Sequence, residues 1–517
     1  MKDQKIRVRF APSPTGPLHI GGVRTALYNY LFAHKYNGKL ILRIEDTDQN
    51  RYVPGAEDYI IESLDWCGIR FDEDCIHGGP YGPYRQSERR LIYREFAEQL
   101  VGNGYAYYAF DTSEELEMMR EKGKNKDVSS SQYGPFTRLG MKNSLSLSQE
   151  EVKHLISSGK PYVIRIRIPE NEEVHVNDLI RGDVLVQSSS LDDKVLFKSD
   201  GWPTYHLANI VDDHLMEISH VIRGEEWLPS APLHVLLYRY LGWEETMPKF
   251  AHLPLLLKPD GNGKLSKRDG DRLGFPVFPL QWIDPVTKDI SSGYRESGYL
   301  PVAFVNMLAF LGWNPGTEKE LFTMDELIHE FSLERIGKHG SKFDPEKARW
   351  YNHQYLIKKP EEELIGFLKK ELEIRNLHFE DSYIANVIHL IKERAILIPD
   401  LWNNAWFFFI QPTVYDEPVV NKVWNPASIV SSLMSTFLEE AARIEDWEHN
   451  QIQSFIQDFI SRKNMKMGQL MNPLRLLMVG NNQGPGIIDI AAILGKEEFL
   501  KRIKTGLGKL PGSNIAF

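Results

Sequence analysis

FAPSPTGPLHIGG, residues 10–22, joins a predicted strand to a predicted helix. Residues 6–10 alternate apolar and polar side chains, as a strand does, and apolar side chains recur at helical spacing over residues 23–31. The Gly21–Gly22 pair leaves room for a ligand close to the backbone. His19 stands beside the free N–H groups expected at the start of the helix, which favour an anion. The stretch therefore predicts phosphate binding at the switch point of a parallel sheet.

The composition is that of an ordinary globular protein, with 517 residues of which 42% are hydrophobic and 26% are charged. This length is too great for one core, because domains typically hold about 100–200 residues. The sequence contains no apolar run of the roughly 20 residues that a membrane span needs, and its first residues lead into a strand rather than a secretory signal. We therefore expect a cytoplasmic protein with no membrane partner.

The net charge of −10 counts against a nucleic-acid partner, because nucleic-acid phosphates bind basic surfaces. It is a weak objection, since a large acidic protein can carry a local basic face. The two cysteines, Cys67 and Cys75, exclude a disulfide framework and a cysteine-rich zinc site. The partners must therefore be inferred from the motifs.

The order of the predicted elements in the first 300 residues indicates an α/β protein. A second strand over residues 39–44 and a helix beginning at residues 54–57 continue the alternation of strand and helix, which predicts a Rossmann-like parallel sheet. Strands over residues 162–168 and 184–186 belong to an inserted mixed unit, and residues 197–265 return to the alternating pattern.

After about residue 300 the chain is predicted to be helical. Apolar side chains recur at helical spacing in several stretches, which indicates a helical core without chemistry of its own. One such helix is expected to start with Asn425 as its cap and Pro426 as its first helical residue.

A second motif, KLSKR at Lys264–Arg268, brings three cations next to a glycine-rich turn. Alone it is typical of a solvated basic turn. Together with the His19 helix start it predicts a loop that closes over polyphosphate and stabilises a leaving pyrophosphate. The sequence has no Gly-Lys pair followed by Ser or Thr and no G-x-G-x-x-G after the first strand, so a P-loop and a dinucleotide site are disfavoured.

A third group of residues has the charges of an amino-acid pocket. Arg9, Arg223 and Glu45 would complement a ligand with two carboxylates and one ammonium group. A guanidinium group binds a carboxylate bidentately and stays charged, so it can distinguish glutamate from glutamine. Tyr205 and Asn209 lie on neighbouring predicted elements. Each of these residues alone is more often structural, and only the set of charges indicates a pocket.

With these motifs the chain resembles bacterial-type glutamyl-tRNA synthetases, which are class I aminoacyl-tRNA synthetases. The resemblance extends over nearly the whole sequence, and its further matching segments are Arg43–Asp48, Tyr52–Glu57, Tyr205–Trp227, Gly298–Pro301, Leu311–Trp313 and Asn472–Arg475. It implies ATP-dependent ligation of L-glutamate to tRNA(Glu) through a glutamyl-adenylate, with release of AMP and pyrophosphate. The implied cofactors are ATP and Mg²⁺, the implied partner is tRNA(Glu), and the family default is a monomer.

The resemblance also implies the roles of individual residues. Those implied for catalysis are His19, Gly21, Lys264 and Lys267. Those implied for glutamate are Arg9, Ser13, Glu45, Tyr205, Asn209 and Arg223, with Glu45 pairing the ammonium group and the arginine for the side-chain carboxylate left open. Those implied for ATP are His19, Gly21, Gly22, Glu226, Trp227, Lys264, Ser266 and Lys267, and no metal held by the protein is implied.

The fold that the resemblance implies is an α/β Rossmann-like catalytic domain with an inserted mixed α/β acceptor-binding domain, followed by all-α anticodon-binding domains. The implied parts are residues 1–90 and 205–268 for the two catalytic halves, 91–204 for the insert, 269–350 for a stem-contact domain and 351–517 for the helical anticodon-binding region.

Two features depart from the family pattern. Some members hold zinc through Cys-x-Cys, where this chain has Tyr108-Ala109-Phe110, so no zinc is expected. The connection after Arg268 is unusually long. Three alternatives remain: an enzyme that also glutamylates tRNA(Gln), a glutamyl-transferring enzyme that modifies a tRNA base, and a non-catalytic tRNA-binding homologue.

Overall fold

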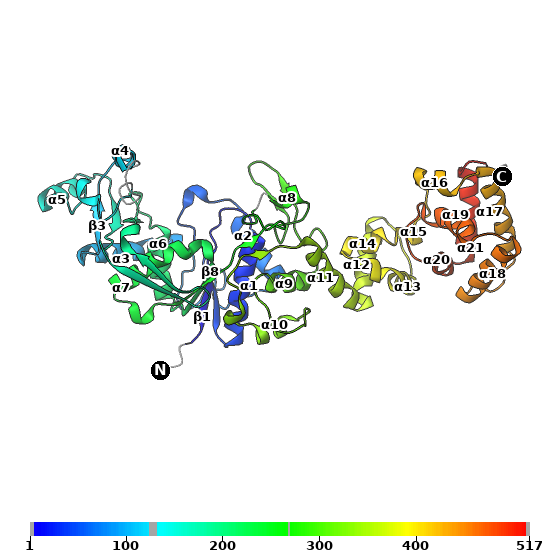
Figure 1. Cartoon of the computed structure of the whole chain (residues 1–517), viewed down its shortest axis with the longest axis horizontal. Coiled ribbons are helices and arrows are strands. Elements are labelled where there is room, and N and C mark those ends of the chain that lie inside the picture. The colour runs from blue at the N-terminus through cyan, green and yellow to red at the C-terminus, as the bar shows by residue number, and fades with distance from the viewer. Residues whose placement is uncertain (1–4, 124–131, 267–268, 513–517) are drawn as a thin grey trace. The chain divides into compact units, whose positions relative to one another are not determined.

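The computed structural model describes residues 5–123, 132–266 and 269–512. The chain forms two compact units (Figure 1). The first consists of Met1–Glu296 with Pro301–Ala348, and the second consists of Ser297–Leu300 with Arg349–Phe517. Within the described ranges, no helix is both long and apolar enough to cross a membrane.

The amino-terminal stretch forms the strand–helix–strand unit that the sequence predicts. Strands β1 (Arg7–Phe10) and β2 (Lys39–Leu42) pair in parallel, with Arg7 opposite Lys39, and helix α1 (Ile20–Lys35) connects them. Strand β2 ends two residues earlier than predicted. Regular pairing ends at Leu42, although the Arg43 N–H still donates to the Phe10 carbonyl at 3.0 Å, and the Arg43 side chain is buried among carboxylates.

The sheet beside β1 is mixed rather than purely parallel. Its strand order is β6-β5-β9-β8. Strands β8 (His220–Gly224), β9 (Lys249–Leu253) and β5 (Glu173–Asp178) are parallel, whereas β6 (Gly182–Gln187) is antiparallel to β5. The predicted parallel sheet is therefore correct only for part of the sheet, because the β5–β6 hairpin of the inserted segment extends it.

A separate antiparallel sheet of strands β3 (Ala106–Ala109), β4 (Val163–Ile166) and β7 (Val195–Phe197) lies within the inserted segment. The remaining strands of the first unit are β10 (Leu256–Leu257), β11 (Trp282–Ile283), β12 (Ile290–Ser291) and β13 (Ser341–Lys342). Its remaining helices are α2 (Ala56–Trp66), α3 (Arg90–Gly102), α4 (Ser113–Gly123), α5 (Gln149–Ser157), α6 (Tyr205–Leu215), α7 (Ala231–Tyr240), α8 (Asp269–Leu273), α9 (Pro301–Ala309) and α10 (Met324–Glu330).

The second unit is helical, as predicted. After α11 (Pro345–Lys358) its helices are α12 (Glu361–Ile374), α13 (Asp381–Ile391), α14 (Ile398–Asn403), α15 (Trp406–Phe409), α16 (Glu417–Val423), α17 (Ala427–Ala441), α18 (His449–Arg462), α19 (Met467–Val479), α20 (Ile487–Leu494) and α21 (Lys496–Lys509). The predicted cap of α17 is wrong: Pro426 has an extended backbone with ψ 132° and takes the cap position itself, so Asn425 lies before the helix.

Three buried histidines make the stability of the first unit depend on pH. Burial lowers the pKa of each below its usual 6.5, to about 4 for His220. The other two are His234 and His252. Between pH 6.5 and 4 the unfolded chain binds protons that the folded chain excludes, so stability is complete above pH 6.5 and falls as the pH drops through this window.

We expect the urea midpoint of the full chain to fall between pH 6.5 and 4, and to fall less steeply in His220→Gln. The control is His175→Gln, because the side chain of His175 is 68% exposed and its removal should leave the slope unchanged. Equal slopes for His220→Gln and the unmodified chain would contradict the assignment.

Candidate active site

A cavity of about 420 Å³ opens where strands β1 and β8 end. The carboxyl ends of parallel strands are the usual place for a ligand in such sheets. Twelve of the residues that the sequence analysis selected line it: Arg9, Ser13, His19, Gly21, Gly22, Glu45, Tyr205, Asn209, Arg223, Glu226, Trp227 and Lys264. The amino-terminal motif and the distant lysine motif therefore meet at one cavity.

The start of helix α1 is capped by His19. Its Nδ1 accepts a hydrogen bond from the Gly21 N–H at 3.1 Å, and its carbonyl oxygen accepts from the Gly22 and Val23 N–H groups. The Ile20 N–H donates to the Val277 carbonyl at 3.0 Å. All four N–H groups are thus engaged, and the prediction of free N–H groups here is wrong. Of the predicted anion site, the helix dipole and the His19 ring remain.

The long connection after Arg268 explains part of this geometry. It supplies the Val277 carbonyl for Ile20, and Phe278 lies edge-on to the His19 ring with the centroids 6.3 Å apart. The connection thus packs against the helix start and helps to hold His19.

The protein atoms around Gly21 leave room for a small side chain. A Cβ atom added there would lie 3.5 Å from His19 Nδ1 and 3.8 Å from Leu256 Cδ1, which are ordinary contact distances. A Cβ on Gly22 would come within 2.6 Å of Leu18 Cδ1. A side chain at Gly22 would therefore collide with Leu18, whereas a side chain at Gly21 would fit within the protein and extend into the cavity.

The lysine motif reaches the same cavity through Lys264. Its Nζ contacts Glu226 Oε1 at 2.8 Å, and both side chains are about half exposed. Ser266 does not line the cavity; its hydroxyl donates to Asp269 Oδ2 at 2.6 Å. Lys267, which the resemblance assigns to ATP and catalysis, lies outside the described residues.

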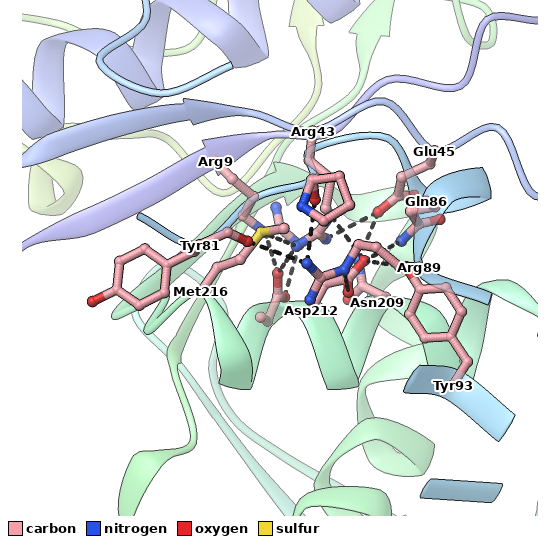
Figure 2. A network of polar contacts seen from close by, with 12 residues as sticks. Arg9, Arg43, Glu45, Tyr81, Gln86, Arg89, Tyr93, Asn209, Asp212 and Met216 are labelled. Carbon is pink, nitrogen blue, oxygen red and sulfur yellow. Dashed lines mark hydrogen bonds and ion pairs between the residues drawn. The ribbon is translucent and has the colours of Figure 1, made fainter. Parts of the chain in front are cut away.

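A buried cluster of charges lies beside the cavity, formed by residues of strand β1, of the segment after β2, of the turn before α3 and of helix α6. Figure 2 shows Arg9, Arg43 and Arg89 converging on the helix that carries Asp212. Their ion pairs, at 2.7 to 3.0 Å, are Arg9–Asp213, Arg43–Asp213, Arg43–Glu45 and Arg89–Asp212. Three arginines and three carboxylates therefore balance in this cluster, with Arg9 and Glu45 at the cavity wall.

Neutral side chains donate further hydrogen bonds to these carboxylates. Gln86 and Tyr93 each donate to Asp212 Oδ2 at 2.8 Å, and the amide of Asn209 donates to Glu45 Oε1 at 3.1 Å. Burial would raise the pKa of Asp213, but the charges of Arg9 and Arg43 outweigh it and lower that pKa. These ion pairs and hydrogen bonds hold Arg9 and Glu45 in place, and burial raises the pKa of the Glu45 carboxyl.

Arg223 is held differently from Arg9. It is buried, and its guanidinium group donates to three neutral acceptors: His252 Nε2 at 3.0 Å, the Tyr205 hydroxyl at 2.7 Å and the Trp227 carbonyl at 3.4 Å. Within the part of the chain that the structure describes, no carboxylate is paired with it. Arg223 therefore brings an unbalanced positive charge to the cavity.

Sequence reasoning missed several residues of this site. Arg24 and Arg51 also line the cavity, and Arg24 is buried on α1 with its guanidinium group bonded to the carbonyls of Leu311 and Pro254. Asp212 and Asp213 could have been found from the sequence, because an acidic pair interrupts the apolar face of α6.

Among the described residues, no group of three or more His, Cys, Asp or Glu side chains is arranged to hold a metal ion.

Comparisons with known proteins find matches along nearly the whole chain. The family "tRNA synthetases class I (E and Q), catalytic domain" matches residues 5–350, and an anticodon binding domain matches residues 361–507. The chain is 57% identical to a glutamate–tRNA ligase of Parabacteroides distasonis over 508 residues, and 57% identical to one of Bacteroides fragilis over 505 residues; each match covers 98% of this chain and 99% of the relative.

A solved structure is similar as well. It is a glutamate–tRNA ligase from Elizabethkingia meningosepticum in complex with its amino acid, with a TM-score of 0.92 and 50% identity, covering 98% of this chain and 100% of that one. A glutamate–tRNA synthetase from Elizabethkingia anophelis matches with a TM-score of 0.88, also at 50% identity, over 97% of this chain and 99% of that one.

Proposed function

The chain belongs to the class I tRNA synthetases for glutamate and glutamine, and we propose that its cavity holds glutamate and ATP side by side for adenylate formation. The observation that carries the function is the 57% identity with glutamate–tRNA ligases along 98% of the chain. The protein is therefore an enzyme that ligates glutamate to tRNA. A match to an anticodon binding domain at residues 361–507 also counts against a glutamyl transferase that modifies a base, since such relatives lack that domain.

The charges around the cavity support a glutamate pocket. Glutamate has two carboxylates and one ammonium group, and the wall offers Arg9, Arg223 and Glu45. We propose that the two arginines bind the carboxylates and that Glu45 binds the ammonium group. Tyr205, Asn209 and Ser13 complete the pocket, because the first two fix Arg223 and Glu45 by hydrogen bonds and Ser13 lies on the same wall.

ATP is proposed to lie between the helix start and the lysine motif. His19, Gly21 and Gly22 would face its phosphates on one side, and Lys264 and Lys267 on the other, with Glu226 and Trp227 near the nucleoside. The resemblance also assigns Ser266 to ATP, and to reach the nucleotide its hydroxyl would have to leave Asp269. Mg²⁺ would enter with the ATP as part of the substrate. A carboxylate oxygen of glutamate attacks the α-phosphorus, the bond from that phosphorus to the bridging oxygen breaks, and pyrophosphate leaves. Positioning and positive charge carry this step, with no side-chain nucleophile.

The tRNA is proposed to contact three further parts of the chain. Residues 91–204 would bind the acceptor end, residues 269–350 the stem, and the helical region of residues 351–517 the anticodon of tRNA(Glu), by stacking and hydrogen bonds to unpaired bases. Residues 1–90 and 205–268 would form the two halves of the catalytic domain. The family resemblance further supports a cytoplasmic monomer, and the sequence Tyr108-Ala109-Phe110 in place of Cys-x-Cys supports an enzyme without zinc.

Charging assays test this proposal. The purified protein, ATP, Mg²⁺ and radiolabelled glutamate should yield glutamyl-tRNA with tRNA(Glu), and a parallel reaction with tRNA(Gln) shows whether the second tRNA is also a substrate. Failure to charge either tRNA, with ATP and glutamate in excess, would contradict the assignment.

We expect Gly21→Ala to weaken ATP binding without unfolding the protein. A methyl group there has room in the protein but occupies space in the cavity. Overpacking typically costs about 1–3 kcal/mol, so the KM for ATP should rise by about 5- to 150-fold. Alanine is a better helix residue than glycine, so thermal stability should not fall. An unchanged KM for ATP would contradict the placement of the phosphates.

A further inference from the structure

Arg223 is supported from behind by two buried residues that do not line the cavity. Its Nε donates to His252 Nε2 at 3.0 Å, and His252 Nδ1 lies 2.6 Å from Asp178 Oδ2. We propose that Asp178 and His252 are positioning residues for Arg223, which aim its guanidinium group at a carboxylate of glutamate while leaving its charge unbalanced. This inference rests on the proposed role of Arg223 in the glutamate pocket.

The three side chains come from three adjacent strands of one sheet. Arg223 on β8 pairs directly with His252 on β9, and Asp178 at the end of β5 pairs with Phe250, two residues before His252. Because side chains two residues apart on a strand share a face, this register brings the three side chains together. Asp178 and His252 are almost fully buried, at 2% and 0% exposure.

The hydrogen bonds around Asp178 determine which nitrogen of His252 carries the proton. One carboxylate oxygen accepts from the Ile180 and Arg181 N–H groups, at 2.9 and 2.8 Å. The other accepts from the backbone N–H of His252 at 3.1 Å and faces Nδ1. A carboxylate only accepts, so the proton lies on Nδ1 and Nε2 is left as an acceptor for Arg223. Burial lowers the pKa of His252, which keeps the ring neutral.

A neutral acceptor fixes Arg223 without cancelling its charge. Arg9 illustrates the opposite arrangement, because Asp213 binds two of its nitrogens directly, at 3.0 and 3.2 Å. The negative charge of Asp178 is separated from Arg223 by the imidazole ring. Arg223 uses three of its N–H groups on His252, Tyr205 and the Trp227 carbonyl, and a guanidinium group has five, so donors remain for a substrate carboxylate.

The first test is Asp178→Asn in the full-length enzyme. The amide NH₂ group would donate to His252 Nδ1, and the ring proton would move to Nε2, where it would face the Arg223 N–H. Loss of such an outer partner typically costs about 10- to 100-fold. We expect the KM for glutamate to rise by about that factor, with the KM for ATP and kcat at saturating glutamate within about twofold. Equal changes in the two KM values would overturn the inference.

A double-mutant cycle separates positioning from general damage. His252→Leu alone should raise the KM for glutamate but add little in an Arg223→Met background, since it acts through Arg223. His252→Gln, which keeps an acceptor for Arg223, should restore much of the loss. Additive effects, or no difference between Leu and Gln, would overturn the inference. The control is His220→Gln, a buried histidine at the start of β8 outside the cavity, which should leave the KM for glutamate unchanged.

The same cycle distinguishes this inference from the proposed function. If Arg223→Met leaves the KM for glutamate unchanged, the assignment of Arg223 to the pocket fails. If Arg223→Met raises it and the Asp178 and His252 variants do not, only the positioning role fails.

Discussion

Replacing Arg43 by methionine is expected to lower the free energy of unfolding by about 3–5 kcal/mol, the typical cost of breaking a buried ion pair from one side. The Arg43 side chain is fully buried and contacts Asp213 at 2.7 Å and Glu45 at 3.0 Å. Without it these carboxylates stay buried with one cation fewer. Urea unfolding of the full chain, with glutamate binding as a second readout, measures the loss.

The dependence of this loss on pH identifies its cause. Buried carboxylates that have lost their cation have a raised pKa and can bind a proton in the folded state. The difference in stability between Arg43→Met and the unmodified chain should therefore shrink as the pH falls from 7 to 5. The control is Lys39→Met, whose lysine forms an ion pair with Asp72 at 2.8 Å but is 56% exposed, so its removal should cost less than about 1 kcal/mol. Equal losses in the two variants would contradict the role of the cluster.

Replacing Lys267 by alanine is expected to slow adenylate formation by about 10²- to 10³-fold, the usual effect of removing one group that stabilises charge in the transition state. Its neighbour Lys264 lines the cavity beside Glu226, and the KLSKR motif brings Lys267 within three residues of it. Negative charge moves onto pyrophosphate only as the reaction proceeds, so the dissociation constant of glutamate should change little.

Two measurements on Lys267→Ala are needed. Rapid-quench kinetics gives the rate of adenylate formation, and calorimetry gives the affinity for glutamate. Lys249→Ala, at an exposed position at the start of β9, is the control and should be unchanged in both. Similar losses of rate and of glutamate affinity in Lys267→Ala would remove the motif from the leaving-group end of the site.

The sequence predicted the parts of the fold that depend on local pattern. The β1–α1–β2 unit and the helical second unit follow from the spacing of apolar side chains, which the chain carries residue by residue. The mixed sheet could not be predicted in this way, because the pairing of β5 with β9 joins segments more than 70 residues apart. Local pattern does not encode which distant strand becomes the neighbour.

The residues of the site likewise divide into those that a local motif reveals and those placed by contacts with distant elements. The residues with a recognisable motif, such as His19 and Lys264, lie at the cavity as expected. The residues that hold others in place, such as Arg43, Asp213 and His252, were missed because their partners lie on distant elements. The free N–H groups predicted at the helix start were wrong, because His19 engages three of them locally and the Val277 carbonyl, from far along the chain, accepts from Ile20.

Exchange of labelled pyrophosphate into ATP tests most directly whether one cavity binds glutamate and ATP together and joins them. With glutamate and tRNA(Glu) supplied, we expect exchange that requires glutamate and that falls by about 10²-fold or more in Lys267→Ala. Exchange no faster than in the absence of glutamate, from folded protein that binds tRNA, would contradict it.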